Sequence, residues 1–283
     1  RPAAACIGLM VSVLTSCLAA TPMRIETAPP DQAASATFVS PLASRSASSQ
    51  LALDVPGFLP AVLVVPSGSE ARPLVVAAHG AGGAPEWDCD HWARLTQGHA
   101  FVLCPRGTAM GSGAFYFKQH HALGEEVRAG VAAARQKFPR ILPTSGVYAG
   151  FSQGASMGAL MIASYAEQFP YVVLVEGFTQ WNVALGQRFA RGGGRAVLFV
   201  CGTQDCANKA EASTLALKRT PLRARAEHAK RAGHTGSGAV GELVEWQLPW
   251  LLADDPAWAY RAARGRRPCS CQVRWRPCSD PRC

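Results

Sequence analysis

The sequence of 283 residues lacks several patterns that would indicate a function directly. Inside the body of the chain no apolar run reaches about 18 residues, the length that predicts a membrane-spanning helix. No segment has the glycine spacing of a phosphate or dinucleotide loop, and Gly192-Gly193-Gly194 precedes an apolar strand-like run, so we interpret it as a linker. No internal repeat is present. The sequence therefore predicts no nucleotide site and no cofactor.

Acidic residues are few relative to basic ones, and the formal net charge is +9. From Arg261 to the end, seven arginines and one aspartate contribute +6, which leaves +3 for the other 260 residues. Because the charge is concentrated in one tail, it says little about the partners of the body. We therefore expect no nucleic-acid partner.

The C-terminal segment 259–283 is rich in Arg and Cys and has few apolar residues, so we expect it to be disordered. Its cysteines follow a C-x-C-x6-C-x4-C pattern, which lacks the C-x2-C pairs typical of zinc sites. These are Cys269, Cys271, Cys278 and Cys283. No metal site is predicted.

The N-terminal segment 1–16 has a positive start and an apolar run, and it leads into Leu14-Thr15-Ser16-Cys17. This resembles a bacterial lipoprotein signal, in which the cysteine, here Cys17, is lipidated; an ordinary signal peptide cut near Ala19-Ala20 is the alternative. Residues 17–50, rich in Ala, Ser, Thr and Pro, predict a flexible tether. We expect an exported protein, either a periplasmic or outer-membrane-anchored lipoprotein or a secreted one, that touches a membrane only through a lipid anchor.

The body, residues 51–258, alternates between short apolar runs and helical stretches. This alternation predicts an α/β fold, a doubly wound and mostly parallel sheet with helices on both faces. We expect strands at 60–65, 73–78, 101–104, 147–149, 171–175, 196–200 and 222–227, and helices at 87–97, 123–138 and 238–252. The longest insertion, 108–121, is expected to be a loop.

The segment Gly150-Phe151-Ser152-Gln153-Gly154 lies between a strand and a helix-forming run. G-x-S-x-G in this setting predicts a nucleophilic serine on a sharp turn, where glycines on both sides keep the strained backbone free of side chains. Ser152 would stand at a helix N-terminus, which favours developing negative charge. The alternative is a glycine-rich turn with no chemical role.

A serine nucleophile needs a base and an orienting carboxylate, which in this class of sheet lie on loops after strands. Asp205 follows the strand 196–200, and His234 lies in a glycine-flanked loop before the last helix. His228 falls within or at the edge of a strand. We therefore predict Ser152, Asp205 and His234 as catalytic residues. Alternatively, Asp205 caps a helix that starts at Cys206, and His234 is an exposed loop histidine.

An acyl-transfer intermediate also needs two N–H donors for its oxyanion. Gln153, directly after the nucleophile, would provide one. The other would come from the loop His79-Gly80-Ala81-Gly82-Gly83 after the strand 73–78. We expect His79 to pack behind this turn.

Together, His79-Gly80-Ala81-Gly82-Gly83, Gly150-Phe151-Ser152-Gln153-Gly154, Gly202-Thr203-Gln204-Asp205 and Gly233-His234-Thr235 resemble the α/β-hydrolase superfamily over about 51–258. The nucleophile segment is most similar to the carboxylesterase, phospholipase and acyl-thioesterase branch. The resemblance implies the triad order Ser, Asp, His, and Ala81 as the second oxyanion donor with Gly82 next. The chain departs in having Cys206 where such loops often carry proline.

We therefore interpret the protein as a serine hydrolase that cleaves a carboxylic ester or thioester of a small or lipid-like substrate through an acyl-enzyme. A peptidase or amidase, and a non-catalytic binding module on the same scaffold, are the alternatives. Gly82, Tyr116 and Trp181 are candidate substrate contacts, and the alternative for the two aromatic residues is a place in the core. An exported protein would permit the disulfides Cys201–Cys206 and Cys89–Cys104, with free thiols as the alternative.

Overall fold

The computed structural model describes residues 49–259. Several predictions fall outside the described residues: the signal at 1–16, the lipidation of Cys17, most of the tether, up to residue 48, and the disorder of the tail from residue 260. The first strand begins at Ser49, so the last two residues of the predicted tether, 49 and 50, belong to the sheet. Within the described residues no helix is both long enough and apolar enough to cross a membrane.

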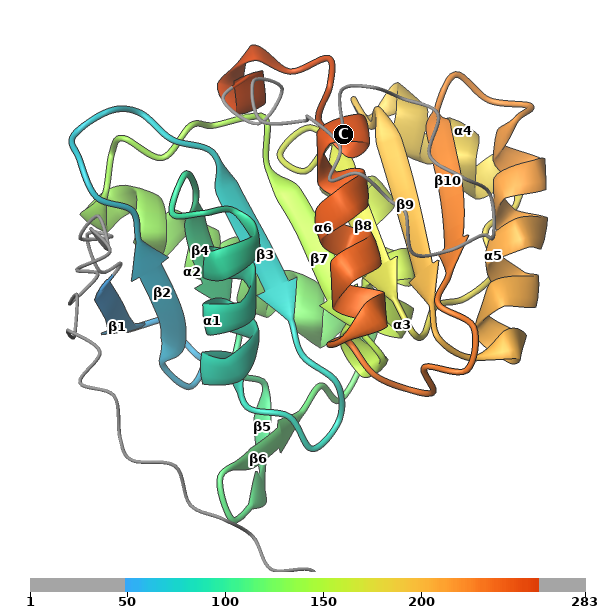
Figure 1. Ribbon diagram of the computed structural model, residues 1–283. Helices are drawn as coiled ribbons and strands as arrows, with labels where there is room; N and C mark the ends of the chain where they lie inside the picture. The colour runs from blue at the N-terminus through green and yellow to red at the C-terminus, as the bar shows by residue number, and fades with distance from the viewer. Residues whose placement is uncertain (1–48, 260–283) are drawn as a thin grey trace, which may run out of the picture. The chain divides into compact units, whose positions relative to one another are not determined.

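An eight-stranded sheet forms the centre of the domain, with the order β1-β2-β4-β3-β7-β8-β9-β10 (Figure 1). The pairs β1/β2 and β2/β4 are antiparallel, and all the remaining pairs of this sheet are parallel. The mostly parallel sheet predicted from the sequence is therefore confirmed. The strands are β1 Ser49–Leu53, β2 Ala61–Val65, β3 Leu74–Ala78, β4 Phe101–Cys104, β7 Val147–Phe151, β8 Tyr171–Val175, β9 Ala196–Cys201 and β10 Arg223–His228.

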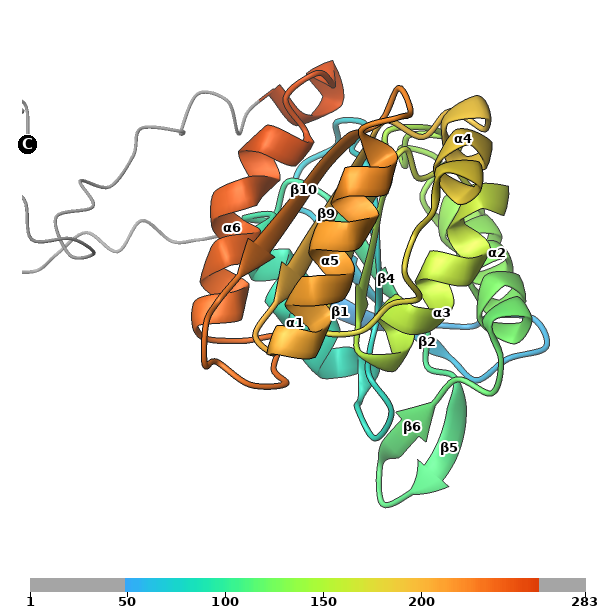
Figure 2. The ribbon, with the colours of Figure 1, turned by 90° about the vertical axis from the view of Figure 1, so that its right-hand side faces the viewer.

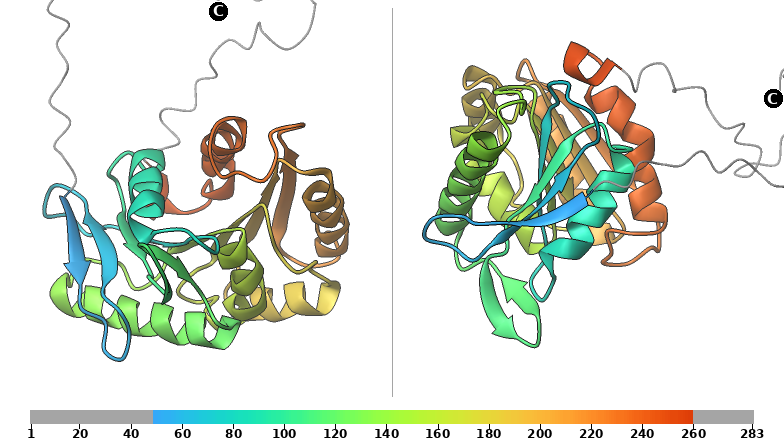
Figure 3. Two further views of the ribbon diagram at one scale, coloured as in Figure 1. Left: turned by 90° about the horizontal axis from the view of Figure 1, so that it is seen from below. Right: turned by 90° about the vertical axis from the view of Figure 1, so that its left-hand side faces the viewer.

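Helices cover both faces of the sheet, as Figures 2 and 3 show. Helices α1 (Pro85–Leu95) and α6 (Ala239–Leu251) pack on one face. The other face carries α2 (His120–Lys137), α3 (Gln153–Met161), α4 (Val183–Arg191) and α5 (Gln204–Leu217). Two 3₁₀ turns, η1 (Ile162–Ser164) and η2 (Pro256–Trp258), follow α3 and α6. The arrangement is doubly wound.

Each central strand is apolar along its whole length because both of its faces are buried. In β3, Leu74 and Val76 pack toward the helices of the α2 face, while Val75 and Ala77 pack toward α1 and α6. All five residues of β3 are buried. This two-sided burial explains the uninterrupted apolar runs in the sequence.

The insertion expected to be a loop instead forms a two-stranded hairpin, β5 (Thr108–Gly111) and β6 (Ala114–Tyr116). It lies beyond the end of the sheet at which β3 and β7 finish (Figure 1). Backbone hydrogen bonds tie it to the loop after β3: the Gly82 N–H donates to the Phe115 carbonyl at 2.8 Å, and the Phe115 N–H donates to the Gly83 carbonyl at 2.9 Å.

Candidate active site

The residues of the candidate site follow the carboxyl ends of four parallel strands, which all lie at one edge of the sheet. The loop 79–83 follows β3, Ser152 follows β7, Glu176 follows β8, and His234 lies in the loop after β10. One edge thus gathers residues that are up to 155 positions apart in the chain.

Ser152 occupies the strained turn that the glycine pattern predicts. Its backbone has φ 51° and ψ −108°, a conformation that a residue with a side chain rarely adopts. A Cβ on Gly154 would collide with the Ala78 carbonyl, and one on Gly150 would collide with the backbone of Gly154. The turn therefore permits no side chain at either flanking position.

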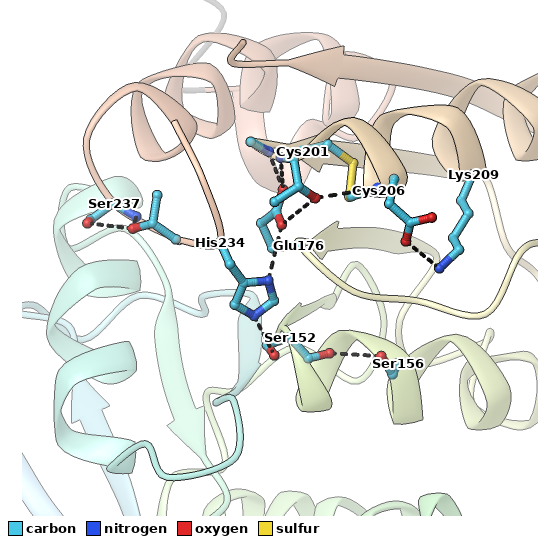
Figure 4. Close-up of polar contacts among 12 residues, drawn as sticks. Ser152, Ser156, Glu176, Cys201, Cys206, Lys209, His234 and Ser237 are labelled. Carbon is cyan, nitrogen blue, oxygen red and sulfur yellow. Dashed lines mark hydrogen bonds and ion pairs between the residues drawn. A yellow bond between two sulfur atoms is a disulfide. The ribbon is translucent and has the colours of Figure 1, made fainter. Parts of the chain in front are cut away.

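The imidazole of His234 lies beside the serine. Its Nε2 is 2.8 Å from the Ser152 Oγ, and its ring is 5.4 Å from that of Phe151, between centroids. The side chain is 54% exposed, so solvent reaches the imidazole. Figure 4 shows His234 between Ser152 on one side and Glu176 on the other. The base that the sequence predicts is therefore in contact with the predicted nucleophile.

The carboxylate on the far side of the imidazole belongs to Glu176 and not to Asp205. The Glu176 Oε2 lies 3.2 Å from the His234 Nδ1. A carboxylate can only accept, so Nδ1 carries the hydrogen, and Nε2 is free to accept from the Ser152 hydroxyl. This is the tautomer that a general base requires.

Glu176 is buried, and its charge is compensated by donors from one short segment. Its Oε1 accepts the backbone N–H groups of Gly202 and Thr203, the latter at 2.8 Å. Its Oε2 accepts the Thr203 hydroxyl at 3.1 Å. The side chain is 1% exposed, and hydrogen bonds of this number are what an ionised buried carboxylate needs.

Asp205 lies in the first turn of α5, and its predicted role as the triad acid is wrong for this geometry. Its side chain is 81% exposed and its Oδ2 pairs with the Lys209 Nζ at 2.7 Å, one turn further along the helix (Figure 4). Thr203, not Asp205, caps α5. One sequence signal did point to Glu176: it directly follows the apolar run 171–175, and the order Ser, Asp or Glu, His admits a glutamate.

The predicted oxyanion donors Ala81 and Gln153 lie in two segments that adjoin the serine, the loop after β3 and the start of α3. Gly80 lies against Ser152, since a Cβ on Gly80 would be 3.1 Å from the serine Cβ. Gln153 is the first residue of α3, so its N–H has no partner within the helix. Among the described residues, neither the Ala81 nor the Gln153 N–H has a hydrogen-bond acceptor. Both are available to a ligand.

Buried polar groups hold the loop after β3 in place. His79 is wholly buried, and its ring nitrogens contact the carbonyls of Gly80 and Arg106 at 2.7 and 3.0 Å. Glu126 accepts the N–H groups of Arg106 and Gly107 at 2.8 and 2.9 Å, and burial raises the pKa of its carboxyl. His79 thus packs behind the turn, as expected.

The three candidate substrate contacts lie in different environments. Gly82 is exposed in the loop after β3, and Tyr116 is half-buried on the β5–β6 hairpin. Trp181 is wholly buried, and its ring packs edge-on against Phe189 and Phe199 in the core. Its predicted role as a substrate contact is therefore wrong, because an aromatic residue after a strand can equally fill the core.

Both predicted cysteine pairs are bonded in the structure, Cys89 to Cys104 and Cys201 to Cys206. In the described part of the chain, the one cluster of three side chains with metal-ligand chemistry is Glu176 with Cys201 and Cys206. Since the two sulfurs are bonded to each other, neither is a thiolate ligand. The cluster is a disulfide beside a carboxylate.

No family model and no curated protein matches the sequence. Solved structures do match. TT1662 from Thermus thermophilus is 18% identical with a TM-score of 0.55, over 73% of this chain and 98% of that chain. Esterase PE8 is 16% identical with a TM-score of 0.55, over 71% and 100%. FphF, a fluorophosphonate-binding serine hydrolase of Staphylococcus aureus, is 10% identical with a TM-score of 0.53, over 73% and 98%.

At these identities the likeness is one of fold. It agrees with the sheet order, with the strained serine between β7 and α3, and with the sequence resemblance. The chain has the α/β-hydrolase fold.

Proposed function

We propose that this protein is a serine hydrolase that cleaves a carboxylic ester or thioester through an acyl-enzyme on Ser152. The observation that carries the proposal is the hydrogen-bonded series from the Ser152 hydroxyl through the His234 imidazole to the buried Glu176 carboxylate. The named functions of similar folds, esterase and serine hydrolase, support the same class.

In the acylation step, the Ser152 Oγ attacks the substrate carbonyl while the His234 Nε2 takes the hydroxyl proton. Glu176 stabilises the imidazolium that forms and keeps its Nδ1–H directed away from the serine. The N–H groups of Ala81 and Gln153 would donate to the oxyanion. Removal of one such donor typically lowers kcat by about 10²–10³-fold.

His234 then gives its proton to the leaving alcohol or thiol, which departs and leaves the acyl-enzyme on Ser152. In the second half of the reaction His234 takes a proton from water as that water attacks the acyl carbonyl, and it returns this proton to the Ser152 Oγ as the bond between the acyl group and the serine breaks. The exposure of the imidazole gives water access to it. The products are the free acid and the regenerated serine.

We also propose that the protein works in an oxidising compartment. Two disulfides support export, because intracellular thiols of most organisms are kept reduced. Determination of the N-terminal residue, and of any lipid on it, after expression in a bacterial host tests this proposal; an unprocessed N-terminus in the cytosol contradicts it.

A paired substitution tests the catalytic proposal. Hydrolysis of p-nitrophenyl esters from acetate to palmitate is measured for the full chain, for Ser152→Ala and for Ser156→Ala. Ser156 is one turn along α3, and its hydroxyl donates only to the Ser152 carbonyl, at 3.0 Å. We expect Ser152→Ala to abolish turnover and fluorophosphonate labelling, and Ser156→Ala to retain both. Absence of turnover and labelling in the unaltered protein refutes the proposal, and faster cleavage of a matched anilide would identify an amidase instead.

A further inference from the structure

We infer that the Cys201–Cys206 disulfide and Thr203 form a positioning device for the triad carboxylate, so that this disulfide supports turnover and not only folding. The inference rests on the proposed function. It concerns residues that do not touch the substrate and act through Glu176.

The orientation of the Glu176 carboxylate depends on one segment of two residues. Three of its four hydrogen bonds come from Gly202 and Thr203, and the fourth comes from His234. The imidazole cannot fix the carboxylate by itself, because the His234 side chain lies on a loop and is half exposed. Movement of this segment would therefore move Glu176 relative to Nδ1.

The disulfide closes the turn that contains this segment. Cys201 is the last residue of β9, and Cys206 lies in the first turn of α5. The bridge links the strand to the helix across Gly202 and Thr203, and its sulfurs lie within 4.8 Å of a carboxylate oxygen of Glu176. With the bridge intact, α5 cannot separate from the end of β9.

Thr203 joins the cap of α5 to the carboxylate. Its hydroxyl donates to the Glu176 Oε2, and its oxygen accepts the Cys206 N–H at 3.4 Å. Cys206 is thus held by its sulfur and by its backbone. If the bridge were absent, a shift of the first turn of α5 would displace the Thr203 hydroxyl, which also orients Glu176.

Glu176 depends on this external support because its own backbone is strained. Its φ is 51°, in the region that residues with side chains rarely adopt. Such a conformation persists only where the surroundings determine it. A displacement of about 1 Å in a catalytic group can cost about 100-fold in rate. We therefore expect removal of the bridge to lower kcat by about 10- to 100-fold.

The second disulfide provides a matched control. Cys89 and Cys104 are wholly buried, like Cys201, but they link α1 to β4 on the other face of the sheet. Their bridge closes a loop of 15 residues against 5 for Cys201–Cys206, so its loss should cost more stability. The inference predicts that loss of the Cys201–Cys206 bridge lowers kcat more than loss of Cys89–Cys104 does, although it lowers stability less.

The experiment compares Cys201→Ala/Cys206→Ala with Cys89→Ala/Cys104→Ala in the full chain, by kcat, KM and Tm. For the first double variant we expect kcat to fall 10- to 100-fold with KM changed less than about threefold. For the second we expect kcat within about threefold and the lower Tm. In a Glu176→Gln background, loss of the Cys201–Cys206 bridge should have less than a twofold further effect, because the positioned group is already absent.

Thr203 tests the same device without removing a disulfide, in case a double variant does not fold. Thr203→Ser keeps the hydroxyl and should retain kcat. Thr203→Val removes the hydroxyl and should lower kcat, with KM little changed. Equal effects of both disulfide variants on kcat, full additivity with Glu176→Gln, or an unchanged kcat in Thr203→Val would each overturn the inference. Failure of the proposed function is distinct, since the unaltered protein would then lack turnover and fluorophosphonate labelling.

Discussion

The choice between Glu176 and Asp205 as the triad carboxylate gives a strong prediction, in which two isosteric amide substitutions should behave in opposite ways. In Glu176→Gln one side-chain oxygen becomes an NH₂ group inside a site that contains only donors. If the NH₂ faces His234, Nδ1 must accept, and Nε2 then carries the hydrogen and cannot act as a base. If it faces Gly202 and Thr203, it opposes their N–H groups.

Neither orientation of the amide satisfies all four contacts. Conversion of the orienting carboxylate of a serine triad to an amide typically lowers kcat by about 10⁴-fold, or about 5.4 kcal/mol of transition-state stabilisation. Because the Glu176 side chain is 1% exposed, water cannot replace the lost interaction. We expect a loss of this order in kcat for p-nitrophenyl acetate, with a smaller change in KM.

Asp205→Asn should leave kcat within about threefold of that of the unaltered protein. Its carboxylate is 81% exposed and pairs with Lys209, and surface pairs of this kind contribute about 0–1 kcal/mol to stability. Circular dichroism and Tm would show that both variants are folded. A 10³-fold or larger loss in Asp205→Asn, together with activity retained in Glu176→Gln, would refute the assignment of the carboxylate.

Three further predictions concern the scaffold. Burial raises the pKa of Asp88 from 3.8 to about 6, while the charge of His79 opposes the rise. The folded state therefore favours the protonated carboxyl, and the unfolding free energy should fall by about 3 kcal/mol as pH rises from about 3 to about 7, with about 2 kcal/mol of that fall between about pH 4 and 6. Asp88→Asn should remove this fall in urea titrations across that range. Gly154→Ala should reduce stability by at least about 1–3 kcal/mol and abolish turnover, because its Cβ would collide with the Ala78 carbonyl, whereas Gly130→Ala in α2 should change stability by less than about 1 kcal/mol. Tyr148→Phe should cost about 1 kcal/mol in urea unfolding, since the buried hydroxyl donates to the Gly154 carbonyl at 2.7 Å; an unchanged unfolding midpoint would contradict it.

The fold could be predicted from the sequence because its signals are local. The strands from β2 to β9 of the large sheet carry apolar runs whose length matches two-sided burial, and the strand expected at 171–175 has those bounds in the structure. The edge strand β10 reads Arg-Ala-Arg-Ala-Glu-His and is only partly buried, so its signal in the sequence is weaker. The sequence pattern did not predict β1 or the β5–β6 hairpin. β1 was assigned in part to the tether, and the glycine-rich segment 108–121 contains a hairpin whose strands are short and partly exposed.

Ser152 and His234 could be predicted for a related reason. The serine turn needs glycine at fixed positions, so its strain leaves a pattern in the sequence. The histidine is one of only two that follow β9 in the chain, and the other, His228, ends a strand. Trp181 had no such constraint, because an aromatic residue after a strand can face either the core or a ligand.

The acid could not be assigned from chain order because Glu176 and Asp205 both follow strands, and the difference between them is spatial. In the sheet β8 lies directly beside β7, while β9 is one strand further away, and neighbouring strands are about 4.8 Å apart. The register pairs Phe151 with Val175, so Ser152 and Glu176 each come one residue after paired positions. Both have a positive φ, of 51° in each case, which turns the chain sharply at the same edge. One imidazole can therefore contact both side chains. Asp205 instead lies in α5, the helix that follows β9, and its carboxylate pairs with Lys209. Since consecutive strands of such sheets are usually neighbours, an acidic residue directly after the strand that follows the nucleophile is the position to weigh first.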